Sequence, residues 1–260
     1  MILHLVDAFA ERPFTGNPAA VCLLSAARKD EWMQQLAFEL GYSETAYVTP
    51  QDGGFSLRWF TPKVEVALCG HATLASAHVL WNVGKAQGPI TFHTLSGALQ
   101  CERDKGLIYL DLPCKDVQDE PPPIGLLSAL DCHKPVAVKR ADTDYLVELA
   151  DEAAVVNATP DFRSLARVGA RGVMITARSS NPEFDFVSRF FAPGSGIDED
   201  PVTGSAHCVL APYWAERLGK NTLRARQLSQ RGGVLEVEVR GDRVRMGGRA
   251  VTVLTGALVV

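Results

Sequence analysis

Long apolar runs are missing from this 260-residue sequence, and so is an excess of either charge. Because a membrane-spanning helix needs about 20 consecutive apolar residues, we expect no membrane partner. The 26 basic and 30 acidic residues give a net charge of −4, which provides no basic surface for nucleic acid. The first residues, MILHLVDAFAERPF, place Asp7 and Glu11 where a secretory signal would need a longer apolar core, so we expect a cytoplasmic protein.

No two of the 6 cysteines form a C-x-x-C pair, which argues against a structural zinc or iron–sulfur site. No G-x-G-x-x-G or G-x-x-x-x-G-K string occurs either, so no nucleotide cofactor is indicated. We therefore expect free thiols, no bound metal and no cofactor. The cysteines are Cys22, Cys69, Cys101, Cys114, Cys132 and Cys208.

Short segments rich in β-branched and aromatic residues dominate the sequence and predict many short strands. One of them is AAVVNA at residues 153–158, which we expect to be a strand. The segment at residues 235–248 alternates around Gly241-Asp242 and predicts a hairpin. An amphipathic helix is predicted over residues 29–41, with Gly41 as its stop.

Two further predicted helices, at residues 70–85 and 204–220, carry no charged side chain for about three turns. A helix that is apolar on nearly all sides is expected to be buried on all sides. Pro212 is expected to kink or interrupt the second helix. Slim, buried helices among many short strands predict an α+β fold in which a mixed sheet curls around one central helix in each half.

An internal repeat relates the two halves. FSLRWFTP at residues 55–62 aligns with FVSRFFAP at residues 186–193 at an offset of 193 − 62 = 131, and the helix starts at Gly70 and Gly204 follow at 134. The preserved order of strand, loop and helix indicates a duplication.

The clearest break between the two halves is CKDVQDEPPPIG at residues 114–125, which is charged and rich in proline and predicts a stiff linker. The predicted domains are residues 1–116 and 117–260.

The repeat predicts that two equivalent helix starts face each other across a cleft between the halves. The first turn of a helix offers N–H donors and a partial positive charge, so we expect the pair to bind a small carboxylate. Gly70 and Gly204 allow close approach of the backbone, and Ser205 adds a hydroxyl donor. Thr203 is a candidate cap of the second helix.

Three acidic residues precede the second helix. Asp200 is the acid best placed to enter the cleft, whereas Asp198 and Glu199 are expected to stay solvated. The alternative is that Asp200 and Thr203 only cap the helix.

His71 and Glu44 are candidates for acid–base chemistry. His71 stands in the first turn of the first buried helix, where the positive helix end should lower its pKa; a purely structural role is the alternative. Glu44 stands at the entrance to an uncharged, strand-like segment. If that segment lies at the cleft, burial raises the pKa of Glu44 and suits it to proton transfer; an ordinary exposed glutamate is the alternative.

Four strings together resemble the phenazine-biosynthesis PhzF-like family. They are DAFAERPFTGNPAAV (7–21), GYSETAYV (41–48), FTPKVEVALCGHATLA (60–75) and DEDPVTGSAH (198–207), and they span nearly the whole chain in the family's order. The resemblance implies a diaminopimelate epimerase-like fold of two similar β-roll domains, each with a central helix and with the active site between them. It also implies that a terminal strand at 251–260 completes the first domain.

The resemblance further implies a cofactor-independent isomerase that moves a proton on a small, cyclic amino or hydroxy carboxylic acid. Glu44 matches the family's general acid/base in the S-E-T string, His71 matches a substrate contact, and Asp200 matches a residue that orients the substrate. A homodimer is the expected assembly.

The expected substrate-binding residues are Gly70 in the C-G-H-A-T string and Gly204 with Ser205 at the start of the second helix. Asn17, in GNPAAV, either lines the cleft or shapes an Asn-Pro turn.

Two other functions stay open. Cys69 stands directly before Gly70, as in a two-cysteine racemase, but the repeat places Thr203 at the equivalent position and Cys208 lies one turn deeper. The second alternative is a protein of the same fold that binds a small carboxylate without turnover.

Overall fold

The computed structural model describes residues 1–259, and the chain divides into two compact units. Unit 1 contains Met1–Leu112 and Arg245–Val260, and unit 2 contains Pro113–Val244. The division falls four residues before the one expected after residue 116, since 116 − 112 = 4, and the end of the chain returns to unit 1 from Arg245 onward. The predicted terminal strand at 251–260 corresponds to β18 (Ala250–Ala257), and its last residue, 260, lies outside the described residues.

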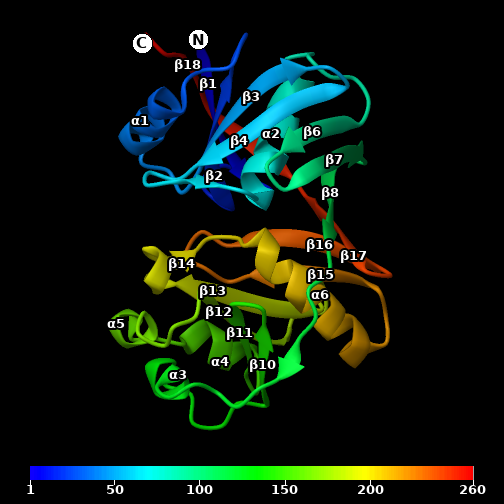
Figure 1. Ribbon diagram of the computed structural model, residues 1–260. Helices are drawn as coiled ribbons and strands as arrows, with labels where there is room; N and C mark the ends of the chain where they lie inside the picture. The colour runs from blue at the N-terminus through cyan, green and yellow to red at the C-terminus, as the bar shows by residue number, and fades with distance from the viewer. Residues whose placement is uncertain (260) are drawn as a thin grey trace. The chain divides into compact units, whose positions relative to one another are not determined.

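Unit 1 is a mixed sheet curled around one helix (Figure 1). The order of the hydrogen-bonded strands in the sheet is β18, β1, β2, β3, β4, β6, β7 and β8. The pairs β2–β3 and β4–β6 are parallel, and the other pairs are antiparallel. The strands are β1 (Ile2–Ala8), β2 (Asn17–Leu23), β3 (Thr45–Gln51), β4 (Gly54–Phe60), β5 (Glu65–Val66), β6 (Ile90–Thr94), β7 (Gly97–Asp104) and β8 (Leu107–Pro113), with the short β5 antiparallel to β4.

Unit 2 repeats this pattern of pairing. Its neighbours run β9, β10, β11, β12, β13, β15 and β16, in which β11–β12 and β13–β15 are parallel and the rest antiparallel. The strands are β9 (Gln118–Asp119), β10 (Ala137–Ala141), β11 (Asp144–Glu148), β12 (Gly172–Arg178), β13 (Phe186–Ala192), β14 (Ile197–Asp200), β15 (Thr222–Gln227) and β16 (Gly233–Arg240), with β14 antiparallel to β13. β17 (Arg243–Gly248) begins in unit 2 and continues in unit 1 from Arg245 onward. The shared order of parallel and antiparallel pairs supports the duplication seen in the sequence.

Each unit has one central helix, α2 (Gly70–Asn82) in unit 1 and α6 (Gly204–Leu218) in unit 2. Most residues of both helices are buried, as expected for helices that are apolar on nearly all sides. α2 packs on β1, β2, β3 and β18, and α6 packs on β15 and β16. The expected interruption at Pro212 does not occur, because α6 continues through it to Leu218.

The remaining helices are shorter and lie outside these centres. α1 (Asp30–Leu40) ends at Gly41, whose φ of 68° is the left-handed conformation that glycine favours. No helix among residues 1–259 has the length and apolar character needed to cross a membrane. The others are α3 (Leu126–Ala129), α4 (Glu152–Asn157), α5 (Phe162–Leu165) and the 3₁₀ turn η1 (Pro193–Ser195).

The prediction of a strand at residues 153–158 was wrong, because α4 occupies this segment. The two adjacent valines favoured a strand, but the Asp151 side chain accepts a hydrogen bond from the Ala154 N–H at 2.8 Å and caps a helix. A cap supplied by one residue outweighs the weak strand preference of a short segment.

The same arginine–glutamate ion pair occurs at equivalent positions of the two units, as expected for a duplication. In unit 1, Arg58 on β4 donates through two nitrogens to both carboxylate oxygens of Glu65 on β5, each at 2.7 Å. In unit 2, Arg189 on β13 donates in the same way to Glu199 on β14, at 2.7 and 3.0 Å. The glutamates are separated by 199 − 65 = 134, the offset of the helix starts, whereas the arginines are separated by 189 − 58 = 131. Unit 2 therefore has three more residues than unit 1 between the arginine and the glutamate.

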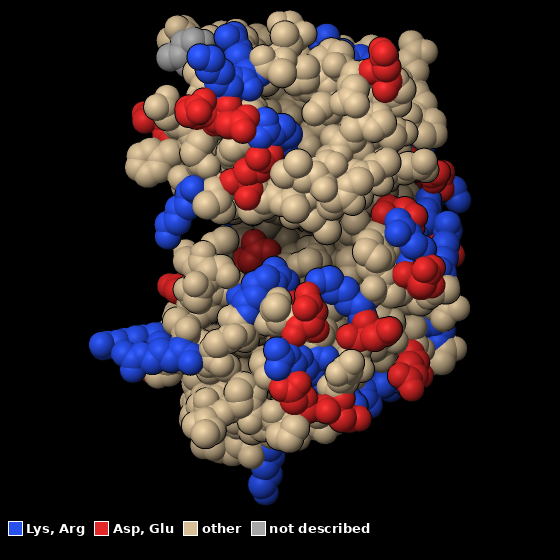
Figure 2. Space-filling model, viewed as in Figure 1, with Lys and Arg blue, Asp and Glu red and all other residues tan. Residues whose placement is uncertain are grey.

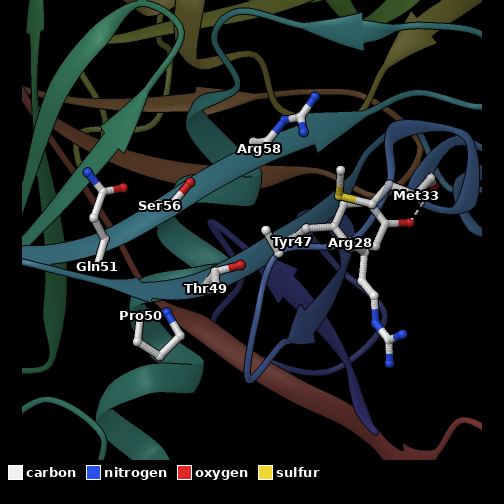
Figure 3. Close-up of a pocket in the computed structure, with 9 residues that line it drawn as sticks. Arg28, Met33, Tyr47, Thr49, Pro50, Gln51, Ser56 and Arg58 are labelled. Atoms are coloured by element: carbon white, nitrogen blue, oxygen red, sulfur yellow. Dashed lines mark hydrogen bonds between the residues drawn. The ribbon is translucent and has the colours of Figure 1, made fainter.

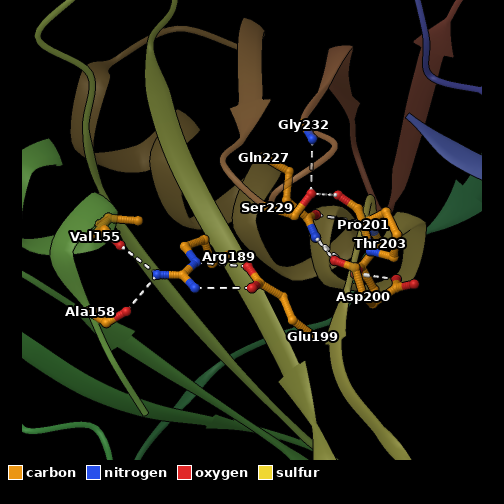
Figure 4. Close-up of polar contacts among 10 residues, drawn as sticks. All are labelled: Val155, Ala158, Arg189, Glu199, Asp200, Pro201, Thr203, Gln227, Ser229 and Gly232. Carbon is orange, nitrogen blue, oxygen red and sulfur yellow. Dashed lines mark hydrogen bonds and ion pairs between the residues drawn. The ribbon is translucent and has the colours of Figure 1, made fainter. Parts of the chain in front are cut away.

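Glu199 is therefore not the solvated acid that the sequence led us to expect. Its side chain is 19% exposed, and that of Arg189 is 12% exposed. The Arg189 guanidinium also donates to the backbone carbonyls of Val155 and Ala158, which ties α4 to the sheet (Figure 4).

Replacing Glu199 by Gln should lower the free energy of unfolding by about 1–3 kcal/mol, because the largely buried Arg189 loses its counter-charge. Urea denaturation provides the measurement. The matched control is Asp198→Asn on the same strand, where the side chain is exposed and the change should stay within about 0.5 kcal/mol. Equal effects of the two substitutions would contradict this role of Glu199.

Candidate functional site

Glu44 lies in the short connection between α1 and β3, directly before the first residue of β3. Its side chain is only 15% exposed, and its Oε2 lies 3.3 Å from Nε2 of His71, whose side chain is 8% exposed. The structure thus brings together two residues that are separated by 27 positions in the sequence, and both were predicted to belong to the site.

Two further side chains complete this cluster. The Ser43 hydroxyl lies 3.4 Å from His71 Nε2, and the Cys69 thiol lies 3.5 Å from His71 Nδ1. Burial raises the pKa of Glu44, and hydrogen bonds from Ser43 and Cys69 oppose that rise only in part. We call Ser43, Glu44, Cys69 and His71 the glutamate cluster. It can hold a carboxyl group that exchanges protons more readily near neutral pH than an ordinary glutamate does.

The start of α2 supplies the backbone of the same cluster. Cys69 is the N-cap residue and is extended, with φ −146° and ψ 108°, and its side chain makes no capping hydrogen bond. The Cys69 carbonyl accepts hydrogen bonds from the Thr73 N–H at 3.1 Å and from the Thr73 hydroxyl at 2.5 Å. Gly70 and His71 form the first turn, whose N–H groups carry the partial positive charge of the helix end.

In unit 2, Asp200 ends β14 and a buried glutamine fixes the turn that follows it (Figure 4). The fully buried Gln227 accepts the Thr203 N–H at 2.9 Å and donates to the Asp200 carbonyl at 2.7 Å. The Thr203 hydroxyl in turn donates to the Asp200 carboxylate at 2.5 Å. Thr203 is the N-cap residue of α6 but, like Cys69 in unit 1, makes no side-chain capping hydrogen bond. Thr203 thus occupies the predicted cap position, but its hydroxyl binds Asp200 instead of a helix N–H.

Ser205 has a cationic neighbour that the sequence did not indicate. Arg171, which directly precedes β12, lies with Nη2 3.4 Å from the Ser205 hydroxyl. The same nitrogen pairs with Asp144, whose side chain is 2% exposed and whose pKa is raised by burial against the opposing effect of Arg171. Gly204 is buried next to Ser205 in the first turn. The start of α6 therefore combines helix N–H groups, a hydroxyl and a guanidinium.

Asn17, the remaining predicted binding residue, is fully buried at the first position of β2, opposite Ala8 of β1. Nothing in this placement separates its two expected roles, and both stay predictions.

A pocket of about 240 Å³ opens elsewhere in unit 1, beside α1, β3 and β4 (Figure 3). Its wall includes Arg58 and the Tyr47 ring, whose hydroxyl donates to the Met33 carbonyl at 2.6 Å. It includes no member of the glutamate cluster, so we do not assign it to the acid–base chemistry.

Charged side chains of both signs are interspersed on the face shown in Figure 2, where Lys and Arg lie next to Asp and Glu. This distribution agrees with the small net charge of −4. It gives that face no extended basic surface of the kind that binds nucleic acid.

The thiols differ in their surroundings. Cys69 is buried but contacts His71, whereas Cys208 is buried within α6 and its pKa is raised to about 12 by burial. The residue of unit 2 that matches Cys69 is Thr203, the N-cap of α6. A second thiol at the position that a two-cysteine racemase would need is thus absent from the start of α6.

Comparison with known proteins places this chain in a family. The family model described as phenazine biosynthesis-like protein matches residues 6–256. The chain belongs to the phenazine biosynthesis-like family. A relative from Halalkalibacterium halodurans named an uncharacterized isomerase is 47% identical over 99% of this chain and 98% of its own length. The chain is an isomerase.

Solved structures confirm the predicted α+β fold of two β-roll units. A PhzF-family protein from Enterococcus faecalis is 42% identical, with a TM-score of 0.94 over 98% of this chain and 97% of that one. A hydroxyproline epimerase from Agrobacterium vitis shares the fold, with a TM-score of 0.66 at 12% identity over 98% of this chain and 91% of that one.

Sequence reasoning found Glu44, Gly70 and His71 in unit 1 and Asp200, Gly204 and Ser205 in unit 2, and their functional roles stay predictions. It missed the contacts of Ser43, Arg171 and Gln227. Ser43 adjoins Glu44 in the S-E-T string, which is a local signal, whereas Arg171 and Gln227 carry no recognisable motif.

Gln227→Met should lower the free energy of unfolding by about 1–3 kcal/mol, because the Thr203 N–H and the Asp200 carbonyl lose their buried partner. Urea denaturation measures the effect. The matched control is Gln230→Met in the same segment, where the side chain is exposed and a change within about 0.5 kcal/mol is expected. If the two variants are equally stable, Gln227 does not hold the start of α6.

Proposed function

We propose that this isomerase is cofactor-independent and moves a proton between two carbons of a small cyclic amino or hydroxy carboxylic acid, with Glu44 as the general acid/base. The observation that carries the proposal is the enclosure of the Glu44 carboxyl by Ser43, Cys69 and His71. A carboxyl group with a raised pKa can take a proton from one carbon and return it to another near neutral pH.

The proposal gives the helix starts the role of binding the substrate carboxylate. N–H groups at Gly70 and at Gly204 with Ser205 are suited to an anion because they lie in first turns of buried helices. Fixed donors of this kind also stabilise the negative charge that builds up on the substrate when a proton leaves carbon. Arg171, which is paired with Asp144, adds a guanidinium donor beside Ser205 to the proposed binding group.

His71 and Asp200 are proposed to hold the substrate. His71 lies against Glu44, so a substrate atom within reach of the carboxyl is also within reach of the imidazole. Asp200, held by Thr203 and by Gln227 through its backbone, is suited to orient an amino or hydroxyl group. Asn17 as a substrate contact and the homodimer are further parts of the proposal.

Glu44→Gln should reduce solvent deuterium incorporation into a turned-over substrate by about 10²–10⁴-fold, because the amide cannot accept and return the proton. Proton NMR in D₂O, with a panel of cyclic amino and hydroxy acids, measures the exchange. The matched control is Glu39→Gln on the exposed side of α1, which should leave the rate unchanged.

Cys69→Ser separates this mechanism from the racemase alternative. Most of the exchange should remain in Cys69→Ser, because a serine hydroxyl can still donate to Glu44. Loss of exchange in Cys69→Ser with retention in Glu44→Gln would favour a thiol base instead. Binding of the acids without exchange in the wild-type protein would favour a non-catalytic binding protein.

A further inference from the structure

We propose that Glu44, Cys69 and His71 form a binding site for Zn²⁺, with three protein ligands and an open fourth position. Their ligand atoms, a carboxylate oxygen, a sulfur and an imidazole nitrogen, all lie within 4.8 Å of one another. Among the described residues, 1–259, this is the one group of three His, Cys, Asp or Glu side chains that meets this spacing.

The separation of the nitrogen and oxygen atoms matches that of a tetrahedral zinc site, whereas the sulfur lies farther from the same nitrogen. Zinc bonds of about 2.0 Å to oxygen and nitrogen and about 2.3 Å to sulfur place neighbouring ligand atoms about 3.3 Å (N to O) and about 3.6 Å (N to S) apart. The observed distances are 3.3 Å from His71 Nε2 to Glu44 Oε2 and 4.0 Å from His71 Nε2 to Cys69 Sγ, and the same sulfur lies 3.5 Å from His71 Nδ1. Binding of zinc through Nε2 therefore requires the Cys69 thiol to turn from the Nδ1 side of the ring toward Nε2.

Ligand chemistry and charge favour zinc over magnesium or calcium. The set contains sulfur and nitrogen, whereas Mg²⁺ and Ca²⁺ prefer oxygen ligands throughout. A thiolate, a carboxylate and a neutral imidazole together carry two negative charges, which Zn²⁺ neutralises. The bound cluster is then uncharged, which suits a site where Glu44 and His71 are 15% and 8% exposed.

The protein holds two of the ligands in place before any metal arrives. Cys69 and His71 are fixed at the start of α2, where Thr73 donates twice to the Cys69 carbonyl. Glu44 comes from the connection before β3, so the three ligands assemble only in the folded chain. Binding releases the Cys69 thiol proton, together with any proton held by Glu44, to solvent, because the metal binds the thiolate, the carboxylate and the neutral imidazole.

One consequence rests on the proposed function: zinc should reversibly inhibit proton transfer by Glu44. Metal binding itself does not rest on it. A spectroscopic test on the full chain therefore gives an answer even if Glu44 proves not to be the base.

Cobalt(II) serves as the probe, because it occupies tetrahedral zinc sites and its bond to a thiolate absorbs in the near ultraviolet. Titration of the reduced protein should produce this charge-transfer band with one equivalent of Co²⁺, and Zn²⁺ should abolish it. Cys69→Ser should lose the band, and His71→Asn and Glu44→Gln should each lose at least about tenfold in affinity. The matched control, Cys132→Ser in unit 2, should keep the band.

A second measurement on the unaltered protein covers the case in which the Cys69 variant does not fold. Zn²⁺ should slow alkylation of Cys69 by iodoacetamide, followed by mass spectrometry of its peptide, and leave that of Cys132 unchanged. Absence of the band in the wild-type protein, its persistence in Cys69→Ser, or alkylation of Cys69 that ignores Zn²⁺ would overturn the proposed site.

Discussion

The burial of the Glu44 carboxyl group is the physical constraint on which the proposed chemistry depends. Glu44 sits at the entrance to β3 with little exposure, and Ser43, Cys69 and His71 surround it. Burial favours the protonated form, so this group binds its proton more tightly in the folded protein than in the unfolded chain. Its contribution to stability is therefore present below the unfolded pKa and declines as pH rises through the folded pKa. Burying a carboxyl group that ionises therefore lowers the stability of the folded protein, and such groups are concentrated at functional sites.

The two units share the same ion pair and the same form of helix start, but they carry different side chains at that start. In both units a strand arginine binds a glutamate on the short strand that precedes the central helix, Arg58 with Glu65 and Arg189 with Glu199. The helix that follows starts at an extended N-cap residue without a side-chain cap, so its first turn can receive an outside acceptor. Unit 1 places a thiol and an imidazole there, and unit 2 places a threonine and a serine. In the proposed function, the first set serves acid–base chemistry and the second serves binding.

The sequence predicted the larger elements well because their signals are local or repeated. The two buried helices followed from runs of residues that no exposed helix would carry, and the duplication followed from the alignment of residues 55–62 with residues 186–193. The strand predicted at AAVVNA was wrong because a single capping residue, Asp151, decided that segment. The solvated Glu199 was wrong because its partner, Arg189, stands ten positions earlier on another strand. The contact of Arg171 with Ser205 joins the residue before β12 to α6, and no pattern along the chain encodes it.

The most direct test of the central claim is a titration of the Glu44 side chain by carbon NMR in protein labelled at its glutamate carboxyls, with Glu44→Gln to assign the signal. The account predicts that Glu44 titrates above 4.5, the ordinary value for a glutamate, because its charged form is poorly solvated. Titration at or below 4.5 in the folded protein would contradict it, since Glu44 would then be an ordinary ionised carboxylate with no special readiness to carry a proton.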